Sequence, residues 1–150
     1  MNKKIPYVVL VILVLLSTLI FWLRMDNKND GLDKSYVQAL KNDNTGGKTP
    51  QETLNIFLEK LVSGDTAGAS SLFWLKEDLS REAWSKALDE LKKQELLDDM
   101  AKDIKEKSMP DPNNSGDETF RFFLNDNGIT VGIITLKFNK YSGVWKIESI

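Results

Sequence analysis

A run of 19 residues without a charged side chain, from Ile5 to Leu23, constrains this chain more than any other feature of its sequence. At about 1.5 Å per residue, a helix of that length spans roughly 28 Å, close to the thickness of a bilayer's hydrocarbon core. Tyr7 and Trp22 lie near its ends, where aromatic side chains favour the membrane–water interface. The run therefore predicts a transmembrane helix in contact with lipid over residues 5–23.

Two other interpretations of this run compete with a membrane anchor. A cleaved signal peptide has an apolar core of roughly 7–15 residues, followed by a cleavage site with small side chains. Here the run is longer, ends in the bulky residues Phe21 and Trp22, and has no A-x-A pattern after it. A buried core helix is disfavoured because no later segment supplies an apolar partner of that length. We therefore expect an uncleaved anchor.

The charges on either side of the run bear on its orientation. Lys3 and Lys4 precede it and favour a cytoplasmic N-terminus, while Arg24 and Lys28 on the far side weaken that bias. A very short tail before the apolar run is typical of a signal-anchor. We expect residues 1–24 to be the cytoplasmic tip and transmembrane helix of a single-pass cell-membrane protein, with the C-terminal domain outside.

The composition beyond the run excludes several classes of function. Hydrophobic residues make up 41% of the chain and charged residues 28%, a balance typical of globular domains. Cysteine and histidine are both absent, which removes disulfides, thiolate metal sites and the commonest general base. Beyond residue 24 there are 17 basic and 22 acidic residues and no basic stripe, so nucleic acid is not an expected partner.

The soluble part divides into a tether and a domain. Residues 25–48 are rich in Asn, Asp and Gly and are predicted to form a flexible tether, with a short helix around Ser35–Leu40 as an alternative for part of it. Thr49 then offers a helix cap, Pro50 suits the first helical position, and Glu52 completes a capping box. The domain is therefore expected to span residues 49–150.

Apolar residues at helical spacing predict three helices after this start. The first ends at Ser63-Gly64, Asp65 caps a second that runs through Phe73, and Ser80 caps a third. The third stripe slips near Gln94, which predicts a bend or break there. The apolar positions of these helices are Leu54, Phe57, Leu58, Leu61, Val62, Trp84, Ala87, Leu88, Leu91, Leu97, Met100 and Ile104.

The remaining residues predict an antiparallel meander of three strands, over 119–125, 129–140 and 144–150. Asn127-Gly128 and Ser142-Gly143 provide its hairpin turns. Two-residue turns place Leu124 opposite Val131, Phe122 opposite Ile133, Trp145 opposite Lys140 and Ile147 opposite Phe138. These pairings bury odd positions of the long strand at one end and even positions at the other. A β-bulge near Gly132–Ile134 reconciles them on one inner face, and the alternative is that both faces are covered.

The expected inner face of the sheet is apolar and its outer face is charged. The inner residues are Phe120, Phe122, Leu124, Val131, Trp145 and Ile147, whereas Arg121, Lys137, Lys146 and Glu148 suit a solvated outer face. Trp145 is therefore expected in the core and Lys146 in water.

Three helices followed by a bent antiparallel sheet resemble the NTF2-like superfamily, in which a curved sheet wraps a long helix as a cone. Residues 49–58, 63–73 and 143–147 are similar to its first helix, its short second helix and its last strand. The resemblance implies an α+β cone over residues 49–150 and transfers no catalytic residue. Enzymes of that superfamily place polar groups inside the cone, whereas the inner face expected here is apolar. Members behind one N-terminal transmembrane helix include subunits of cell-envelope assemblies.

Several local motifs could carry chemistry, and each has a plainer interpretation. Residues 111–118 begin like an EF-hand loop, but its twelfth position is Phe122 instead of a bidentate Glu. Asp98, Asp99 and Asp103 are interpreted as a solvated helix surface, and the Asn113 sequon as chance. Trp74, Trp84 and Trp145 are interpreted as core residues. Ser70, Ser71 and Ser80 have no histidine to activate them.

The sequence therefore predicts no catalytic, cofactor-binding or metal-binding residue. We expect a membrane-anchored extracytoplasmic interaction module of the cell envelope, with an envelope protein as its partner. A small-ligand binder that uses the cavity of the cone is the alternative, and an enzyme is third.

Overall fold

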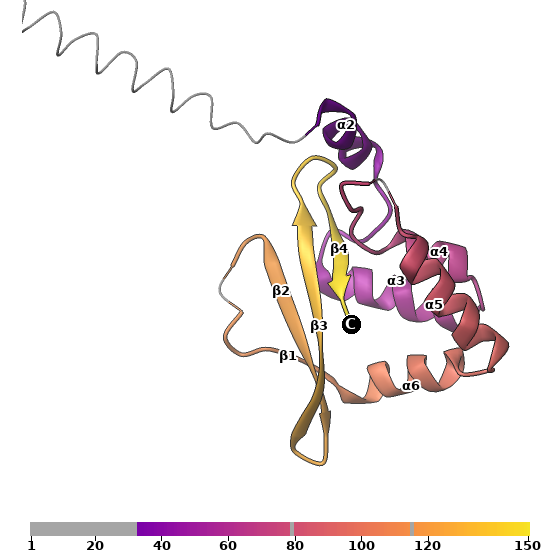
Figure 1. Ribbon diagram of the computed structural model, residues 1–150. Helices are drawn as coiled ribbons and strands as arrows, with labels where there is room; N and C mark the ends of the chain where they lie inside the picture. The colour runs from indigo at the N-terminus through magenta and orange to yellow at the C-terminus, as the bar shows by residue number, and fades with distance from the viewer. Residues whose placement is uncertain (1–32, 79, 115) are drawn as a thin grey trace, which may run out of the picture. The chain divides into compact units, whose positions relative to one another are not determined.

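The computed structural model describes residues 33–78, 80–114 and 116–150 (Figure 1), so the predicted anchor at 5–23 lies outside the described part. The residues from Lys34 to Ile150 form one unit by their mutual contacts. In these described ranges, the structure contains no helix with the length and apolar character needed to cross a bilayer.

The described unit is α+β, as the sequence predicts, with helices packed on an antiparallel sheet. The strand order β1-β2-β3-β4 is a simple meander. Its elements are α2 (Lys34–Asn42), α3 (Pro50–Val62), α4 (Thr66–Ser71), α5 (Glu82–Lys93), α6 (Leu97–Lys107), β1 (Ser108–Pro110), β2 (Thr119–Asp126), β3 (Ile129–Asn139) and β4 (Val144–Ser149).

The predicted capping signals act where the sequence places them. The Thr49 hydroxyl accepts a hydrogen bond from the Glu52 amide, and the Glu52 side chain accepts one from the Thr49 amide, which completes the capping box of α3. Asp65 accepts from the Gly68 amide at 2.8 Å and caps α4. Ser80 accepts from the Glu82 amide at 3.1 Å, although Arg81 is the residue at the cap position of α5.

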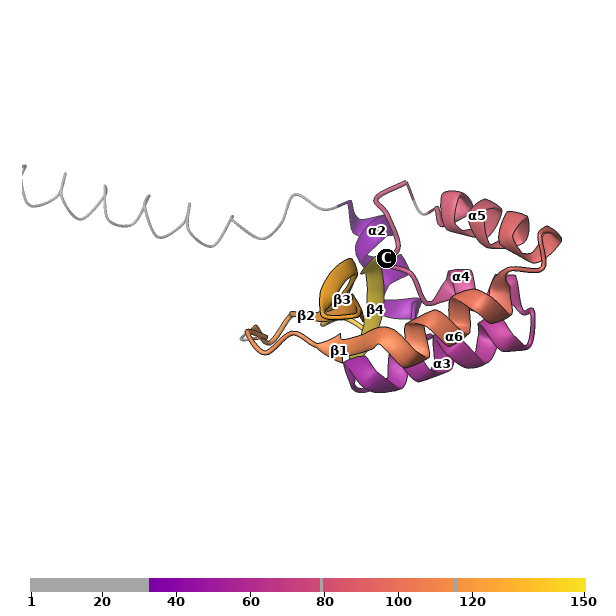
Figure 2. The same cartoon turned by 90° about the horizontal axis from the view of Figure 1, so that it is seen from below.

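The predicted break between the third helix and its continuation is confirmed. Helix α5 ends at Lys93, and Glu95 adopts a φ of 61° before α6 begins at Leu97. This left-handed residue turns the chain, so that α6 lies beside α3 (Figure 2). Both helices can then contact the same sheet.

The hairpin between β2 and β3 contains a β-bulge, but its register differs by one residue from the prediction. Leu124 pairs with Gly132 and Asn125 with Thr130, so Val131 is the extra residue. Phe122 therefore lies opposite Ile134 instead of Ile133. Since a shift of one residue reverses the side-chain direction, even positions of β3 face the core and Val131 does not.

The second hairpin has a longer loop than predicted. Asn139 pairs with Val144, so residues 140–143 form the loop, and Trp145 lies opposite Phe138 instead of Lys140. Ile147 likewise lies opposite Leu136 instead of Phe138, and the register shifts only beyond this pair, where Thr135 pairs with Ser149 and Glu148 is the extra residue. The observed partner of Trp145, Phe138, is two residues away from the predicted partner, Lys140. Because side chains alternate with a period of two along a strand, Trp145 keeps its predicted direction.

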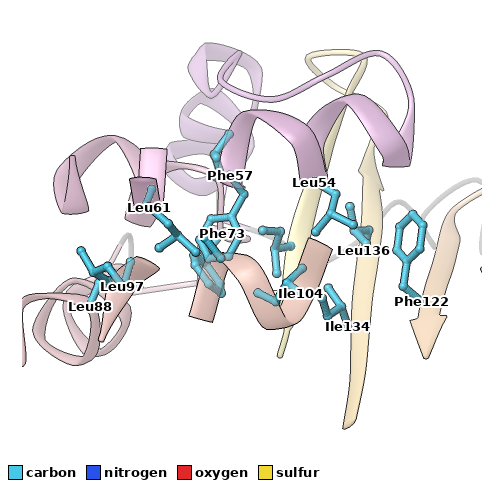
Figure 3. Packing of buried hydrophobic residues seen from close by; sticks show 14 residues of the cluster. Leu54, Phe57, Leu61, Phe73, Leu88, Leu97, Ile104, Phe122, Ile134 and Leu136 are labelled. Carbon is cyan, nitrogen blue, oxygen red and sulfur yellow. The ribbon is translucent and has the colours of Figure 1, made fainter. Parts of the chain in front are cut away.

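The core fills the space between the sheet and helices α3 and α6 (Figure 3). Phe122 and Ile147 are buried there as predicted, while Phe120, Leu124 and Trp145 are half-buried against the same cluster. Val131 is 61% exposed and its predicted inner position is wrong, because the bulge lies at that residue. The other large buried side chains of the cluster are Leu54, Phe57, Leu61, Leu72, Phe73, Leu88, Leu97, Ile104, Ile134 and Leu136.

The predicted tether, 25–48, is not free along its second half. Tyr36 and Leu40 on α2 are buried, and the Tyr36 hydroxyl donates to the Leu75 carbonyl at 2.7 Å. The Asn139 side chain also donates to the Leu40 carbonyl at 2.8 Å. Tyr36 and Leu40 are four residues apart and therefore lie on one apolar face of α2, which packs against the rest of the domain. The packed unit thus begins at Lys34 instead of residue 49.

Candidate functional site

The residue that departs most from its predicted position is Lys146 on β4. Its side chain is fully buried instead of solvated. The ammonium group donates to Asp43 Oδ1 at 2.6 Å, to Thr45 Oγ1 at 2.6 Å and to the Ser71 carbonyl at 2.8 Å. The loop after α2 and the end of α4 cover this face of β4, and neither contact can be read from strand alternation.

Asp43 balances the charge of Lys146 and is shared with a second cation. The Arg81 guanidinium donates to Asp43 Oδ2 and, at 2.6 Å, to the Phe73 carbonyl. Burial lowers the pKa of Lys146 to about 8, and Arg81 acts in the same direction, whereas the hydrogen bond and charge of Asp43 oppose the shift. The cluster therefore joins α2, α4, the start of α5 and β4.

The hydrogen-bond donors of Lys146 in this buried cluster are all satisfied by groups of the protein itself. A lysine ammonium has three N–H donors, and each has an acceptor here. The loop that carries Asp43 passes so close to β4 that a Cβ on Gly46, which has a φ of 128°, would lie 2.4 Å from the Trp145 carbonyl oxygen. These groups fix one chain segment on another, and that role accounts for all their hydrogen bonds.

The acidic residues that the sequence singles out lie apart from this cluster. Asp98, Asp99 and Asp103 are exposed on α6, and Asp103 pairs with Lys107 at 3.1 Å. Among the residues that the structure describes, no group of three or more acidic side chains has an arrangement that could hold a metal ion.

Asp111, the first residue of the EF-hand-like loop, stabilises the conformation of that loop. Its side chain is buried, accepts from the Asn113 amide at 2.8 Å and pairs with Arg121 at 3.2 Å. Ser115, the fifth position of the motif, lies outside the described residues. Asp111 therefore holds the loop between β1 and β2 on Arg121.

The three tryptophans outside the anchor have separate partners. Trp84 stacks on Phe73 with a centroid separation of 4.1 Å, and Trp145 packs against Phe120 and Phe138. The Trp74 indole donates to the Tyr36 hydroxyl at 3.2 Å. All three are half-buried, and Trp84 and Trp145 pack against the core cluster.

The three serines are engaged locally. Ser70 and Ser71 donate to backbone carbonyls three residues earlier, at 2.9 and 2.6 Å. Ser80 accepts the Glu82 amide described above. Each hydroxyl thus stabilises a helix end or a helical turn.

The surface feature with the clearest potential to bind a partner is an apolar row across three strands. Met109 of β1 pairs with Phe123 of β2, and Phe123 pairs with Ile133 of β3. Met109 is 53% exposed, Ile133 is 43% exposed and Phe123 is half-buried. We call these three residues the apolar row. They lie on the sheet face opposite Phe122 and Ile134, because neighbouring residues on a strand point to opposite faces.

Polar residues border the apolar row along the strands. Arg121 pairs with Thr135 on one side, and Asn125 accepts a hydrogen bond from the Thr130 hydroxyl at 2.9 Å on the other. Val131, next to the row on β3, adds an apolar side chain that is 61% exposed. An exposed apolar group with a polar border is typical of a surface that binds another molecule.

Sequence reasoning missed this row for a specific reason. Strand β1 comes immediately after α6 and has only three residues, too few for a period-two pattern to be read. The signal that could have revealed the row is the pair of consecutive apolar residues on each longer strand, Phe122-Phe123 and Ile133-Ile134. Such pairs place one apolar side chain on each face of a sheet.

Comparison with protein-family models, curated proteins and solved structures finds no match for this chain. The resemblance to the NTF2-like superfamily therefore stays a prediction from the sequence.

Proposed function

We propose that this chain is a membrane-anchored, extracytoplasmic interaction module of the cell envelope that binds a protein partner through the apolar row. The observation that carries the proposal is the exposure of Met109 and Ile133 on one row with Phe123. The charge-free run at 5–23 supports the anchor, and Lys3 and Lys4 support the orientation.

The size of the row is suited to a modest protein contact. Fully burying a side chain such as Ile, Met or Phe contributes about 1.5–3 kcal/mol relative to leaving it exposed. The three residues of the row are already partly covered, so a partner would gain only part of that from each. Because association costs several kcal/mol of lost freedom, the bordering polar residues must also contribute to a stable complex.

The charge of the molecule favours a protein over nucleic acid or an anionic lipid surface at this face. The chain beyond residue 24 has more acidic than basic residues. Asp126 lies at the turn of the β2–β3 hairpin. Both phosphate backbones and anionic bilayers attract clusters of Lys and Arg, which the row does not have within the residues described above.

The chemistry of the described residues supports a non-catalytic role. Lys146, Asp43 and Arg81 form the most unusual group of charges, and their hydrogen bonds hold segments of the domain together. The alternative, a ligand-binding cone, and membership of the NTF2-like superfamily stay predictions. No specific observation raises the ligand-binding alternative above the interaction module, because aromatic and aliphatic side chains fill the space between α3, α6 and the sheet.

A matched pair of variants tests the proposal. Ile133→Glu places a charge in the apolar row, while Thr135→Glu places the same charge two residues along the same strand face, opposite Arg121. The full-length variants would be cross-linked in intact cells, recovered from solubilised membranes and compared with the unmodified protein by quantitative mass spectrometry. Far-UV circular dichroism of each purified variant would verify its fold.

We expect a defined protein partner to be recovered with the unmodified chain and with Thr135→Glu. Its recovery should fall about tenfold with Ile133→Glu, which corresponds to the loss of about 1.4 kcal/mol of binding free energy. Equal recovery of the same proteins with all three chains would refute the assignment of the apolar row.

A further inference from the structure

The apolar row crosses the strands instead of following one of them, and this direction restricts what can bind it. Met109, Phe123 and Ile133 lie on β1, β2 and β3, which are neighbours in the sheet (Figure 1). Neighbouring strands are about 4.8 Å apart, so the row spans about 10 Å. Helix α6 packs against the opposite face of the sheet, together with Phe122 and Ile134. A partner that covers the row must therefore contact three strands at once.

Pairing of an extended partner segment with the free edge of β1 is disfavoured by Pro110. The Asp111 amide donates to the Arg121 carbonyl of β2 at 3.0 Å. Because successive residues of a strand direct their amides to alternate sides, an amide at position 110 would point to the free edge. Proline has no N–H group, and β1 has only three residues. This edge therefore offers little for backbone pairing.

The edge of β3 at the other end of the row is interrupted by the β-bulge. Strand β4 pairs with β3 as far as Thr135, which lies opposite Ser149. The extra residue Val131 lies close to that point and breaks the regular pattern of backbone groups. Residues 132–134 are left between the end of β4 and the bulge, a stretch shorter than the five or six residues of a typical strand. An added strand would find few partners there.

We propose that the apolar row binds an amphipathic α-helix of the partner protein, laid across the three strands. This helix would occupy the row assigned under the proposed function, on which the inference rests. A helix satisfies its own backbone hydrogen bonds, so it needs no free sheet edge. Its residues i and i+7 are about 10.5 Å apart along the axis, close to the span of the row. Residues i, i+4 and i+7 lie on one face of a helix and supply one side chain for each strand.

The polar border of the row sets the width of the apolar stripe on this helix. Arg121 with Thr135, and Asn125 with Thr130, lie beside the row along the strands. The Arg121 side chain is 48% exposed, so it keeps contact with solvent while it pairs with Asp111. Burying such polar groups under apolar side chains costs free energy. The bound helix should therefore have one narrow apolar stripe with polar residues on both sides of it.

Cross-linking from the two ends of the row measures the conformation of the bound segment. A small diazirine amino acid would replace Met109 in one full-length chain and Ile133 in another. Lys86 on α5, which is 74% exposed, is the control position. Each chain would be irradiated in intact cells, and the cross-linked residues of the partner would be identified by tandem mass spectrometry. Circular dichroism of each purified chain would verify its fold.

Pro110→Ala in the full-length protein provides a second measurement, because it supplies the missing amide at the edge of β1. Recovery of the partner should change by less than about twofold, as for an ordinary surface substitution. A larger increase would show that the partner pairs with this edge through its backbone, and would overturn the helix.

We expect both ends of the row to link to one segment of the same protein, at positions centred about seven residues apart. An extended segment would cover the same distance with about three residues, and that spacing would overturn the helix while the proposed function stands. Links to unrelated segments, or between two copies of this chain, would also overturn it. No protein adduct from either position would refute the proposed function itself, and the helix with it.

Discussion

Replacing Lys146 by Met is the most informative perturbation of the fold, because it removes a buried charge and keeps most of the side-chain volume. Lys146 has no exposed surface and makes three hydrogen bonds. Removing one partner of a buried ion pair typically costs about 3–5 kcal/mol. Asp43 keeps Arg81, and the Thr45 hydroxyl still donates to the Ser71 carbonyl at 2.9 Å. We therefore expect Lys146→Met to lower the free energy of unfolding by about 3 kcal/mol, the low end of this range.

The pH dependence of this effect has a definite sign. The pKa of Lys146 is lowered from 10.5 to about 8 in the folded protein, chiefly by burial. Between about pH 8 and 10.5 the unfolded chain therefore holds one more proton at this residue, and this group makes folding more favourable as the pH rises. The Met variant has no such group, so its deficit in unfolding free energy should widen from pH 7.5 to pH 9.5.

Urea unfolding of residues 26–150, followed by circular dichroism at several pH values, measures both effects. Lys86→Met is the control, because that lysine is 74% exposed and its ion pair is with Glu82 on its own helix. Equal stability of the Lys146→Met and Lys86→Met proteins would refute the structural role of the buried cluster. A deficit that narrows as the pH rises would refute the assigned direction of the pKa shift.

Three further predictions concern the core and the anchor. Trp145→Ala should cost about 3 kcal/mol in the same unfolding assay, since Trp145 packs on Phe120 and Phe138, and a loss below about 1 kcal/mol would contradict its core role. The full chain should stay in the membrane fraction after a carbonate wash, whereas deletion of residues 1–25 should give a soluble folded protein, and a mature N-terminus beyond residue 20 would contradict an uncleaved anchor. Protease added outside intact cells should digest the domain, and protection until lysis would reverse the topology.

Local signals in the sequence predicted the secondary structure well. The Thr49–Glu52 capping box and the Asp65 cap set helix starts, and the turn at Asn127-Gly128 separates two strands close to their predicted limits. These features depend on residues within a few positions of each other. The α+β class followed from them, because three helical stripes and three strands leave few other arrangements.

Features that depend on distant contacts were predicted less well. The bulge at Val131 moved the β2–β3 register by one residue, since a bulge is not fixed by the apolar pattern alone. Lys146 looked solvated by alternation, yet Asp43, more than 100 positions earlier in the chain, supplies its counter-charge. The sequence does not show that contact, and a lysine two positions from Glu148 on the same strand face is therefore expected to face water.

The candidate surface shows the same limitation. The apolar row exists only because β1 adds Met109 beside Phe123, and three residues after a helix do not predict a strand. The packing of α2 on the domain could not be predicted either, because Tyr36 and Leu40 occur in a segment whose Asn and Gly content is typical of a linker.

Site-specific photo-cross-linking from the apolar row tests the central claim most directly. A photoreactive amino acid would replace Ile133 in the full-length protein in intact cells, and Lys86 in a control chain. We predict a discrete covalent adduct with another protein from position 133 and none of that mass from position 86. Adducts with lipid alone, or no adduct from position 133 while the protein is folded in the membrane, would contradict a protein-binding role for this face.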